Sequence, residues 1–203
     1  MSFDQFLRRK KSVLSKPDKS YIGEWDEKII PLCNKINSNK NYYTTSSCSG
    51  RIVLMIAQNK KSHNLFLKIS HELISFNWLK NNLSNLKVIP SRAQASKIKN
   101  KFVKFKCEPP IIHVVCRNLE SASLLLEKAK ISGMKHSGIH CLGRNITLEI
   151  HGDDRLEFPI INKNKILVDD DFLKLIAKES NKKLKKSWKI IKKLENSLNN
   201  LSS

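Results

Sequence analysis

A short polar segment at residues 44–51 (TTSSCSGR) holds the residue types best suited to chemistry in this chain. Its first six residues each carry a hydroxyl or a thiol, and Gly50 and Arg51 follow. Ser and Thr compete for local backbone hydrogen bonds and the run lacks an alternating apolar face, so we predict a compact polar turn. Hydroxyls, backbone N–H groups and the guanidinium would converge there on an anion, and Gly50 would let a ligand approach the backbone. The alternative is a serine-rich connection with one exposed arginine.

Two titratable residues and one thiol are further candidates. Asp26 falls in the first turn of a predicted helix, where it is either a favourable charge near the helix N-terminus or a group that faces the serine segment. His113 lies on a strand that is apolar on both faces, so it is either a core histidine or a catalytic one. Cys48 could act as a nucleophile activated by the Arg51 charge, but no Cys-His-Asn pattern can be assembled around it.

Hydrophobic spacing predicts the elements that must position these groups. Apolar spacing predicts helices over residues 2–14, about 25–36, 72–86, 119–131 and about 170–197, the second shortened or kinked by Pro31 and the fourth capped by Asn118. Strands are predicted over residues 52–57, 65–70, 102–107, 111–116, 139–142, 145–150, 156–160 and 166–168. Residues 90–101 read as a mobile loop or helix edge.

The order of these elements favours an α+β fold with a mixed β-sheet flanked by helices, rather than a doubly wound sheet of the Rossmann type. We predict one domain over residues 1–203. A glycine-rich exit at residues 132–138 resembles the 44–51 segment in small-residue content, and the two segments are expected to face one another. Each half then pairs such a segment with strands and a helix, which suggests an internal duplication.

Composition narrows the class of partner. The 203 residues hold 38 Lys and Arg against 18 Asp and Glu, a formal charge of +20 that favours a polyanion. Basic predicted helices at both ends and scattered aromatics suit RNA better than a membrane surface. No apolar run is long enough to span a membrane, no secretory signal is visible, and five cysteines without metal spacing indicate reduced thiols, so we expect a cytoplasmic protein without a metal site.

Familiar nucleotide and metal motifs are absent from the sequence. It contains no G-x-G-x-x-G after the first strand, no Walker loop and no H-E-x-x-H. The common dinucleotide and nucleotide-triphosphate enzymes are therefore disfavoured.

Four ordered motifs resemble the wybutosine-synthesis methyltransferase family, the third enzyme of the tRNA wybutosine pathway and its archaeal homologues. Residues 44–51 resemble the family's signature, residues 106–117 (KCEPPIIHVVCR) its central strand, and residues 132–139 (SGMKHSGI) its second glycine-containing loop. An N-terminal pattern that includes Phe6, Arg9, Lys10 and Asp26, and a terminal helix with Asn181, also fit. The resemblance covers almost the whole chain.

This resemblance implies methyl transfer from S-adenosylmethionine to a ring nitrogen of the tricyclic guanosine derivative at position 37 of phenylalanine tRNA. The acceptor nitrogen must lose a proton, so a base is useful. The candidates for the base are Asp26, Glu108 and His113, with Asp26 ahead because it leads into the signature segment.

The resemblance also suggests binding roles. We expect the donor at Ser46, Ser47, Cys48, Ser49, Gly50, Arg51, Ser132, Gly133, Ser137 and Gly138. We expect the tRNA, with its splayed base stacked on an aromatic ring, at Lys10, Tyr43, Thr45, His71, Trp78 and Arg117. The leading alternative is a non-catalytic tRNA-binding module whose serine-rich segment holds phosphate.

Overall fold

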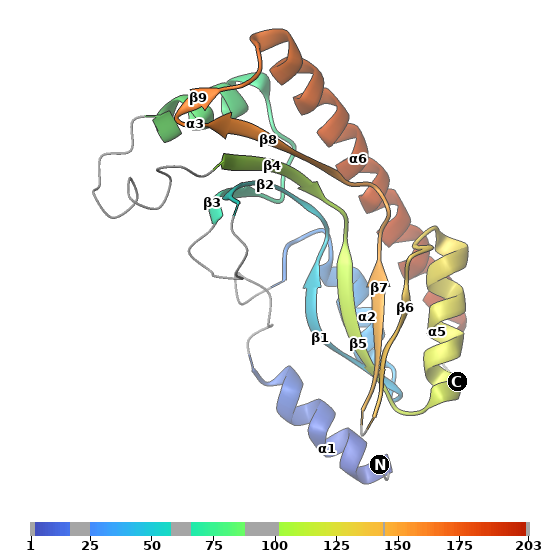
Figure 1. Ribbon diagram of the computed structural model, residues 1–203. Coiled ribbons are helices and arrows are strands. Elements are labelled where there is room, and N and C mark those ends of the chain that lie inside the picture. The colour runs from blue at the N-terminus through green and yellow to red at the C-terminus, as the bar shows by residue number, and fades with distance from the viewer. Residues whose placement is uncertain (1–2, 17–24, 58–65, 88–101, 144, 202–203) are drawn as a thin grey trace. The chain divides into compact units, whose positions relative to one another are not determined.

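The computed structural model describes residues 3–16, 25–57, 66–87, 102–143 and 145–201 of the chain (Figure 1). The helices in these ranges are α1 (Phe3–Leu14), α2 (Ile30–Ser38), α3 (Phe76–Lys87), α5 (Leu119–Ser132) and α6 (Asp170–Ser197), followed by a 3-10 turn at Leu198–Leu201. The strands are β1 (Tyr42–Cys48), β2 (Arg51–Ile56), β3 (Phe66–Ser70), β4 (Phe102–Glu108), β5 (Ile111–Cys116), β6 (Gly138–Leu142), β7 (Ile146–His151), β8 (Leu156–Asn162) and β9 (Lys165–Ile166). None of these helices is long and apolar enough to cross a membrane. The loop predicted at residues 90–101 lies outside the described ranges.

The chain forms two compact units. Unit 1 contains residues 1–50, 109–153 and 186–203, and unit 2 contains residues 51–108 and 154–185. Unit 1 holds a four-stranded sheet, here called sheet A, in the order β1-β5-β7-β6 (Figure 1). Unit 2 holds a five-stranded sheet, sheet B, in the order β3-β2-β4-β8-β9. That the two units act as one methyltransferase-like domain stays a prediction.

The α+β class is confirmed, and so is the absence of a Rossmann-type sheet. The expectation of a mixed sheet is wrong, because all strand pairs described in both sheets are antiparallel. Short connections between paired strands account for this where they occur: Asn162 of β8 and Lys165 of β9, which pair with one another, are separated by two residues only, too few for a crossover helix. The internal duplication stays a prediction.

The core of unit 1 lies on one face of sheet A, called here the inner face. Ile112 and Val114 of β5 and Leu148 and Ile150 of β7 alternate onto this face and are fully buried. They pack with apolar side chains of α2, α5 and the last part of α6. Full burial of one such side chain stabilises the fold by about 1.5–3 kcal/mol. The prediction that the strand at residues 111–116 is central is confirmed, since β5 lies between β1 and β7.

The opposite face of sheet A, the outer face, is covered by α1 at one end. Phe6 of α1 packs against Tyr43 and Val115, with ring centroids of Phe6 and Tyr43 5.3 Å apart. Of the basic residues of α1 next to Phe6, Arg8, Arg9 and Lys11 are exposed, and the Arg9 side chain also hydrogen-bonds to Tyr43 beneath the helix.

Helix α2 begins later than the apolar spacing suggests. Its first residue is Ile30, and Pro31 stands in the first turn, where its missing N–H costs nothing. Pro31 therefore shortens the helix. The placement of Asp26 in the first helical turn is wrong: Asp26 precedes a turn at residues 27–29 and belongs to the connection.

The predicted polar turn at residues 44–51 is largely a strand. Residues 44–48 belong to β1, which pairs with β5 from Tyr42↔Cys116 to Cys48↔Ile111, with a bulge between Thr44 and Ser46. The ladder with β5 supplies the backbone hydrogen bonds that the Ser and Thr side chains were expected to capture. Only residues 49–50 form the connection, and Gly50 adopts a φ of 102°, in the left-handed region that favours glycine.

Helix α5 has both ends that the sequence predicts. The Asn118 side chain accepts a hydrogen bond from the Ser121 backbone N–H at 2.9 Å, and Gly133 ends the helix with a φ of 114°. The long helix predicted near residues 170–197 is α6, and the Phe172 N–H donates to the Asp169 carboxylate at 2.8 Å.

The thiols are mostly buried, as predicted. Cys33, Cys107 and Cys116 are buried, Cys48 is half-buried and Cys141 is exposed, and all five are thiols rather than members of disulfides. Burial raises the pKa of Cys107 to about 11 and that of Cys116 to about 12, so both thiols stay protonated at neutral pH.

Candidate active site

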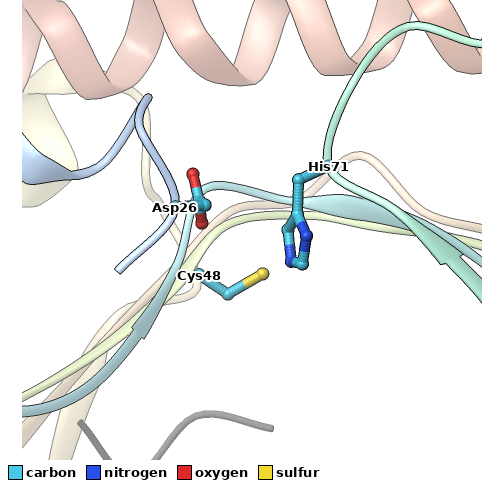
Figure 2. Close-up of side chains that lie close together, drawn as sticks. All are labelled: Asp26, Cys48 and His71. Carbon is cyan, nitrogen blue, oxygen red and sulfur yellow. The ribbon is translucent and has the colours of Figure 1, made fainter. Parts of the chain in front are cut away.

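The carboxylate of Asp26 lies against the end of β1. Asp26 Oδ2 accepts a hydrogen bond from the Ser49 backbone N–H at 2.8 Å, and the Asp26 carboxylate and the Cys48 sulfur lie within 4.8 Å of one another. Figure 2 shows the two side chains side by side; the third residue drawn there, His71, belongs to unit 2. The sequence-based idea that Asp26 faces the serine segment is therefore correct, although the connection rather than a helix positions it.

Two buried polar atoms at this point have no hydrogen-bond partner among the described residues. They are Asp26 Oδ1 and Ser49 Oγ. A buried carboxylate oxygen left unpaired costs free energy, so each such group in a native fold calls for an explanation. The pair is suited to accept a proton or to bind a polar group of a ligand.

A second polar system crosses the outer face of sheet A from β1 to β7. Ser46 Oγ lies 2.9 Å from His113 Nδ1, and His113 Nε2 lies 3.0 Å from Glu149 Oε2. The register Ser46↔His113↔Glu149 places the three side chains in one row. The His113 side chain is 30% exposed, so the prediction of a buried histidine is wrong: its side of β5 is the outer face.

Glu149 is a site residue that sequence reasoning missed. It is 36 residues from His113, and only the strand register brings the two together. The one available signal is a charged residue among apolar neighbours in the predicted strand at residues 145–150.

The two threonine hydroxyls of β1 have structural partners. The Thr44 N–H and the Thr44 hydroxyl both bond to the Asn37 side chain, at 2.8 and 2.9 Å. The Thr45 hydroxyl donates to the His113 carbonyl at 3.5 Å. Ser47 is buried, because the alternation of the strand turns it away from the outer face.

Tyr43 does not offer an aromatic surface to a base. Its side chain is 1% exposed beneath α1, and burial raises its pKa. Tyr43 is therefore unsuitable as the ring on which the splayed base stacks, and stacking on Trp78 stays a prediction.

The second glycine-containing segment supports the turn after α5. The Ser137 hydroxyl donates to the Met134 carbonyl at 2.7 Å and accepts from the His151 N–H at 3.1 Å. Gly133 ends α5 and Gly138 begins β6, while Ser132 is buried with its Oγ unpaired among the described residues. These contacts explain most of the segment without a ligand.

This segment and the end of β1 lie at the same end of sheet A. The register runs from Cys48 to Ile111 and on to His151, whose N–H contacts Ser137. They do not adjoin, however, because β5 and β7 lie between β1 and β6. Three strand spacings of about 4.8 Å separate β1 from β6 by about 14 Å.

Lys10 and Arg117 hold α1 in place. Lys10 Nζ donates to the Asn39 carbonyl at 2.6 Å, and burial lowers the pKa of Lys10. The Arg117 guanidinium lies 5.1 Å from the Phe3 ring centroid. Any contact of these two residues with tRNA stays a prediction.

In unit 2, Arg51 and Glu108 bind one another. Arg51 Nε donates to Glu108 Oε2 at 2.7 Å, and Glu108 Oε1 lies 3.8 Å from Lys106 Nζ. Lys106 also pairs with Glu157, whose pKa is lowered by a hydrogen bond from Lys104. Arg51 therefore braces the start of β2 through an internal carboxylate, and both oxygens of Glu108 face cations.

His71 and Trp78 also belong to unit 2. His71 directly follows β3, as predicted, and Trp78 lies half-buried in the first turn of α3. The connection between them is held by Asn181 of α6, whose side chain accepts from the Ile74 N–H at 2.9 Å and donates to the Ile74 carbonyl at 2.7 Å.

Known proteins resemble this chain over nearly its full length. A protein of Methanocaldococcus jannaschii named tRNA(Phe) 7-((3-amino-3-carboxypropyl)-4-demethylwyosine(37)-N(4))-methyltransferase is 36% identical over 183 residues, which cover 88% of this chain and 89% of that protein. The tRNA wybutosine-synthesizing protein 3 homolog of Mus musculus is 31% identical over 200 residues, 96% of this chain and 73% of that protein.

A solved structure shares the fold. The PH1069 protein from Pyrococcus horikoshii OT3 superimposes with a TM-score of 0.81 at 30% identity, covering 100% of this chain and 98% of that one. The sequence pattern of the family described as Methyltransferase TYW3 matches residues 8–200. The resemblance inferred from the sequence motifs is confirmed: the chain belongs to the methyltransferase TYW3 family.

Proposed function

We propose that this chain transfers the methyl group of S-adenosylmethionine to a ring nitrogen of the tricyclic wyosine-type guanosine at position 37 of phenylalanine tRNA. The substrate is inferred from the names of the relatives: the Methanocaldococcus protein is named for N(4)-methylation of a 4-demethylwyosine at this position of tRNA(Phe). Membership of a methyltransferase family favours this function over a non-catalytic tRNA-binding module.

The end of β1 suits a donor that carries hydroxyl, amino and carboxylate groups. Ser49 Oγ is a buried polar atom with no hydrogen-bond partner among the described residues, so a polar group of the donor would satisfy it. We assign donor binding to Ser46, Cys48, Ser49 and Gly50. The sulfonium of the donor supplies an electrophilic methyl group, and the protein's task is to hold the acceptor nitrogen in line with it.

Asp26 is the base in this proposal, and the observation that supports it is that Asp26 Oδ1 has no hydrogen-bond partner among the described residues. Both ring nitrogens of His113 are engaged, by Ser46 and Glu149, and both oxygens of Glu108 face cations. Asp26, in contrast, accepts the Ser49 N–H through Oδ2 alone. Asp26 Oδ1 can therefore take the proton that the ring nitrogen must lose, a role typically worth 10² to 10⁴ in rate.

Electrostatic attraction brings the tRNA to the protein. The chain carries a formal charge of +20, and exposed cations line α1 and α6, among them Arg8, Lys11, Lys182 and Lys185. Lys183, in contrast, pairs with Asp154 at 3.5 Å. The exposed Lys182 and Lys185 are therefore better phosphate ligands than Lys183.

The test is methyl transfer from radiolabelled S-adenosylmethionine to phenylalanine tRNA that carries the tricyclic base, with and without its 3-amino-3-carboxypropyl side chain. We expect label in the modified base, and none in tRNA with unmodified guanosine at position 37. Calorimetry of donor binding with and without tRNA distinguishes the alternative. A chain that binds tRNA tightly but neither binds the donor nor transfers label is a binding module.

A further inference from the structure

The row across the outer face of sheet A contains one member that the proposed reaction does not use. Glu149 faces His113 from β7, and His113 faces Ser46 of the donor-binding segment from β5. The two hydrogen-bond distances, 2.9 and 3.0 Å, are those of well-formed bonds. The row therefore connects a carboxylate to a hydroxyl of the proposed site through one imidazole ring.

We propose that Glu149 is a positioning residue for this methyltransferase: through His113 it fixes the direction in which the Ser46 hydroxyl points. The proposal rests on the function proposed above, because it assigns the purpose of the row to the donor-binding segment. Glu149 itself is separated from Ser46 by the whole imidazole ring.

The direction of each hydrogen bond follows from donor and acceptor chemistry. An ionised carboxylate only accepts, so the His113 nitrogen that faces Glu149, Nε2, carries the hydrogen. In the neutral ring, Nδ1 is then a bare acceptor, and the Ser46 hydroxyl must donate to it. Ser46 Oγ is left with only lone pairs to offer, so it accepts a hydrogen bond from a ligand N–H.

The ligand chemistry selected in this way is an amino group. A primary ammonium occurs at the amino-acid end of S-adenosylmethionine and, by the name of the Methanocaldococcus relative's substrate, on the side chain of the modified base. The negative charge of Glu149 at the far end of the row also favours a cation. The ammonium that binds Ser46 can therefore belong to the donor or to the modified base, and binding measurements with each ligand distinguish the two.

The surroundings of His113 hold it in this row. The Thr45 hydroxyl donates to its backbone carbonyl at 3.5 Å, and the His140 ring stands edge-on with its centroid 6.5 Å away. Helix α1 covers the neighbouring row of Tyr43 and Val115. The titratable groups that face His113 among the described residues are Glu149 and His140.

The first experiment observes the hydrogen bond directly, in the 203-residue chain without ligands. Nuclear magnetic resonance on histidine labelled with ¹⁵N detects an imidazole N–H proton only where a hydrogen bond slows its exchange. We expect a slowly exchanging Nε2–H of His113 in the wild type and in Glu149→Gln, whose amide oxygen still accepts, and its loss in Glu149→Leu. Thr147→Val, on the same strand and face, is the matched control and keeps the signal.

The second experiment measures affinity for S-adenosylhomocysteine and for its analogue without the amino group. In the wild type the analogue binds roughly tenfold more weakly, as expected for one lost hydrogen bond to a charged group. Glu149→Leu and Ser46→Ala each abolish this difference, and the double variant loses nothing more than Ser46→Ala alone. If the difference appears instead between tRNAs with and without the aminocarboxypropyl group, the side chain of the base occupies the subsite.

Clear results would overturn the proposal. An N–H on Nδ1 in the wild type, or an Nε2–H signal that survives Glu149→Leu, refutes the assigned direction. Additive losses in the double variant refute action through Ser46. Absence of methyl transfer by the wild type would refute the proposed function instead, and would leave the resonance result standing.

Discussion

Replacing Asp26 by asparagine tests the proposed base with little change of shape. The asparagine oxygen can still accept the Ser49 N–H that Asp26 Oδ2 accepts at 2.8 Å. That bond changes from charge-assisted to neutral, which lowers its contribution from about 1.5–3 to about 0.5–1.5 kcal/mol. The new amide nitrogen, in place of the unpartnered Oδ1, adds a cost of similar size. We expect the free energy of unfolding to fall by about 2 kcal/mol.

The effect on the chemical step should be larger. Loss of a general base costs 10² to 10⁴ in rate, which corresponds to about 2.7–5.5 kcal/mol of activation free energy. Binding of tRNA should stay close to that of the wild type, because lysines and arginines supply the phosphate contacts.

Single-turnover methyl transfer at saturating donor and tRNA isolates the chemical step from binding. Thermal melting in parallel measures stability, and Glu27→Gln, an exposed carboxylate next in the sequence, is the control and should behave as the wild type. A rate for Asp26→Asn within threefold of the wild type would refute the argument from the free oxygen. The base would then be His113 or Glu108, or the ring nitrogen would need none.

Four further predictions address the remaining contacts. Cys48→Ser should keep most activity, since no covalent intermediate is required; an inactive Cys48→Ser beside an active Asp26→Asn would favour a nucleophilic thiol. Arg51→Ala should lower both the melting temperature and the activity, because Glu108 loses the hydrogen bond that it accepts at 2.7 Å; we expect the free energy of unfolding to fall by roughly 1–3 kcal/mol. Full stability with lost activity would instead assign ligand binding to the guanidinium. Gly152→Ala should cost roughly 1–3 kcal/mol in denaturant unfolding, because a Cβ there would lie 2.7 Å from the Pro110 ring, whereas Gly138→Ala, with nothing within 4 Å, should cost little. The logarithm of tRNA affinity should fall linearly with the logarithm of salt concentration, by roughly 0.7 to 0.9 per neutralised phosphate, and a flat salt dependence would contradict electrostatic binding.

Local signals in the sequence predicted most of the elements. Asn118 and Gly133 mark the two ends of α5 because each satisfies backbone groups that the helix leaves unpaired. Pro31 marks the start of α2 because the first turn of a helix leaves its N–H groups unpaired, so the missing N–H of proline costs nothing there. A helix that begins at this proline excludes Asp26. These signals act over a few residues, so one sequence is enough to read them.

Cross-strand contacts could not be predicted in the same way. The polar run in β1 favours a turn by its own side chains, yet the ladder with β5, almost 70 residues away, decides its conformation. Glu149 was missed for the same reason: its partner His113 is set by register, and a shift of one residue would turn it to the other face.

Alternation along β1 explains why this strand carries consecutive small polar residues. Ser46 and Cys48 point to the outer face, where Ser46 meets His113, while Ser47 pairs in register with Ile112 and is buried. The N–H of Ser49, at the end of the strand, is left for Asp26. This strand contacts His113 through Ser46 and Asp26 through the Ser49 N–H, so it needs small polar residues close together in the sequence. The same segment can therefore orient a hydroxyl through His113 and Glu149 and also hold the proposed base, Asp26, through the Ser49 N–H at 2.8 Å.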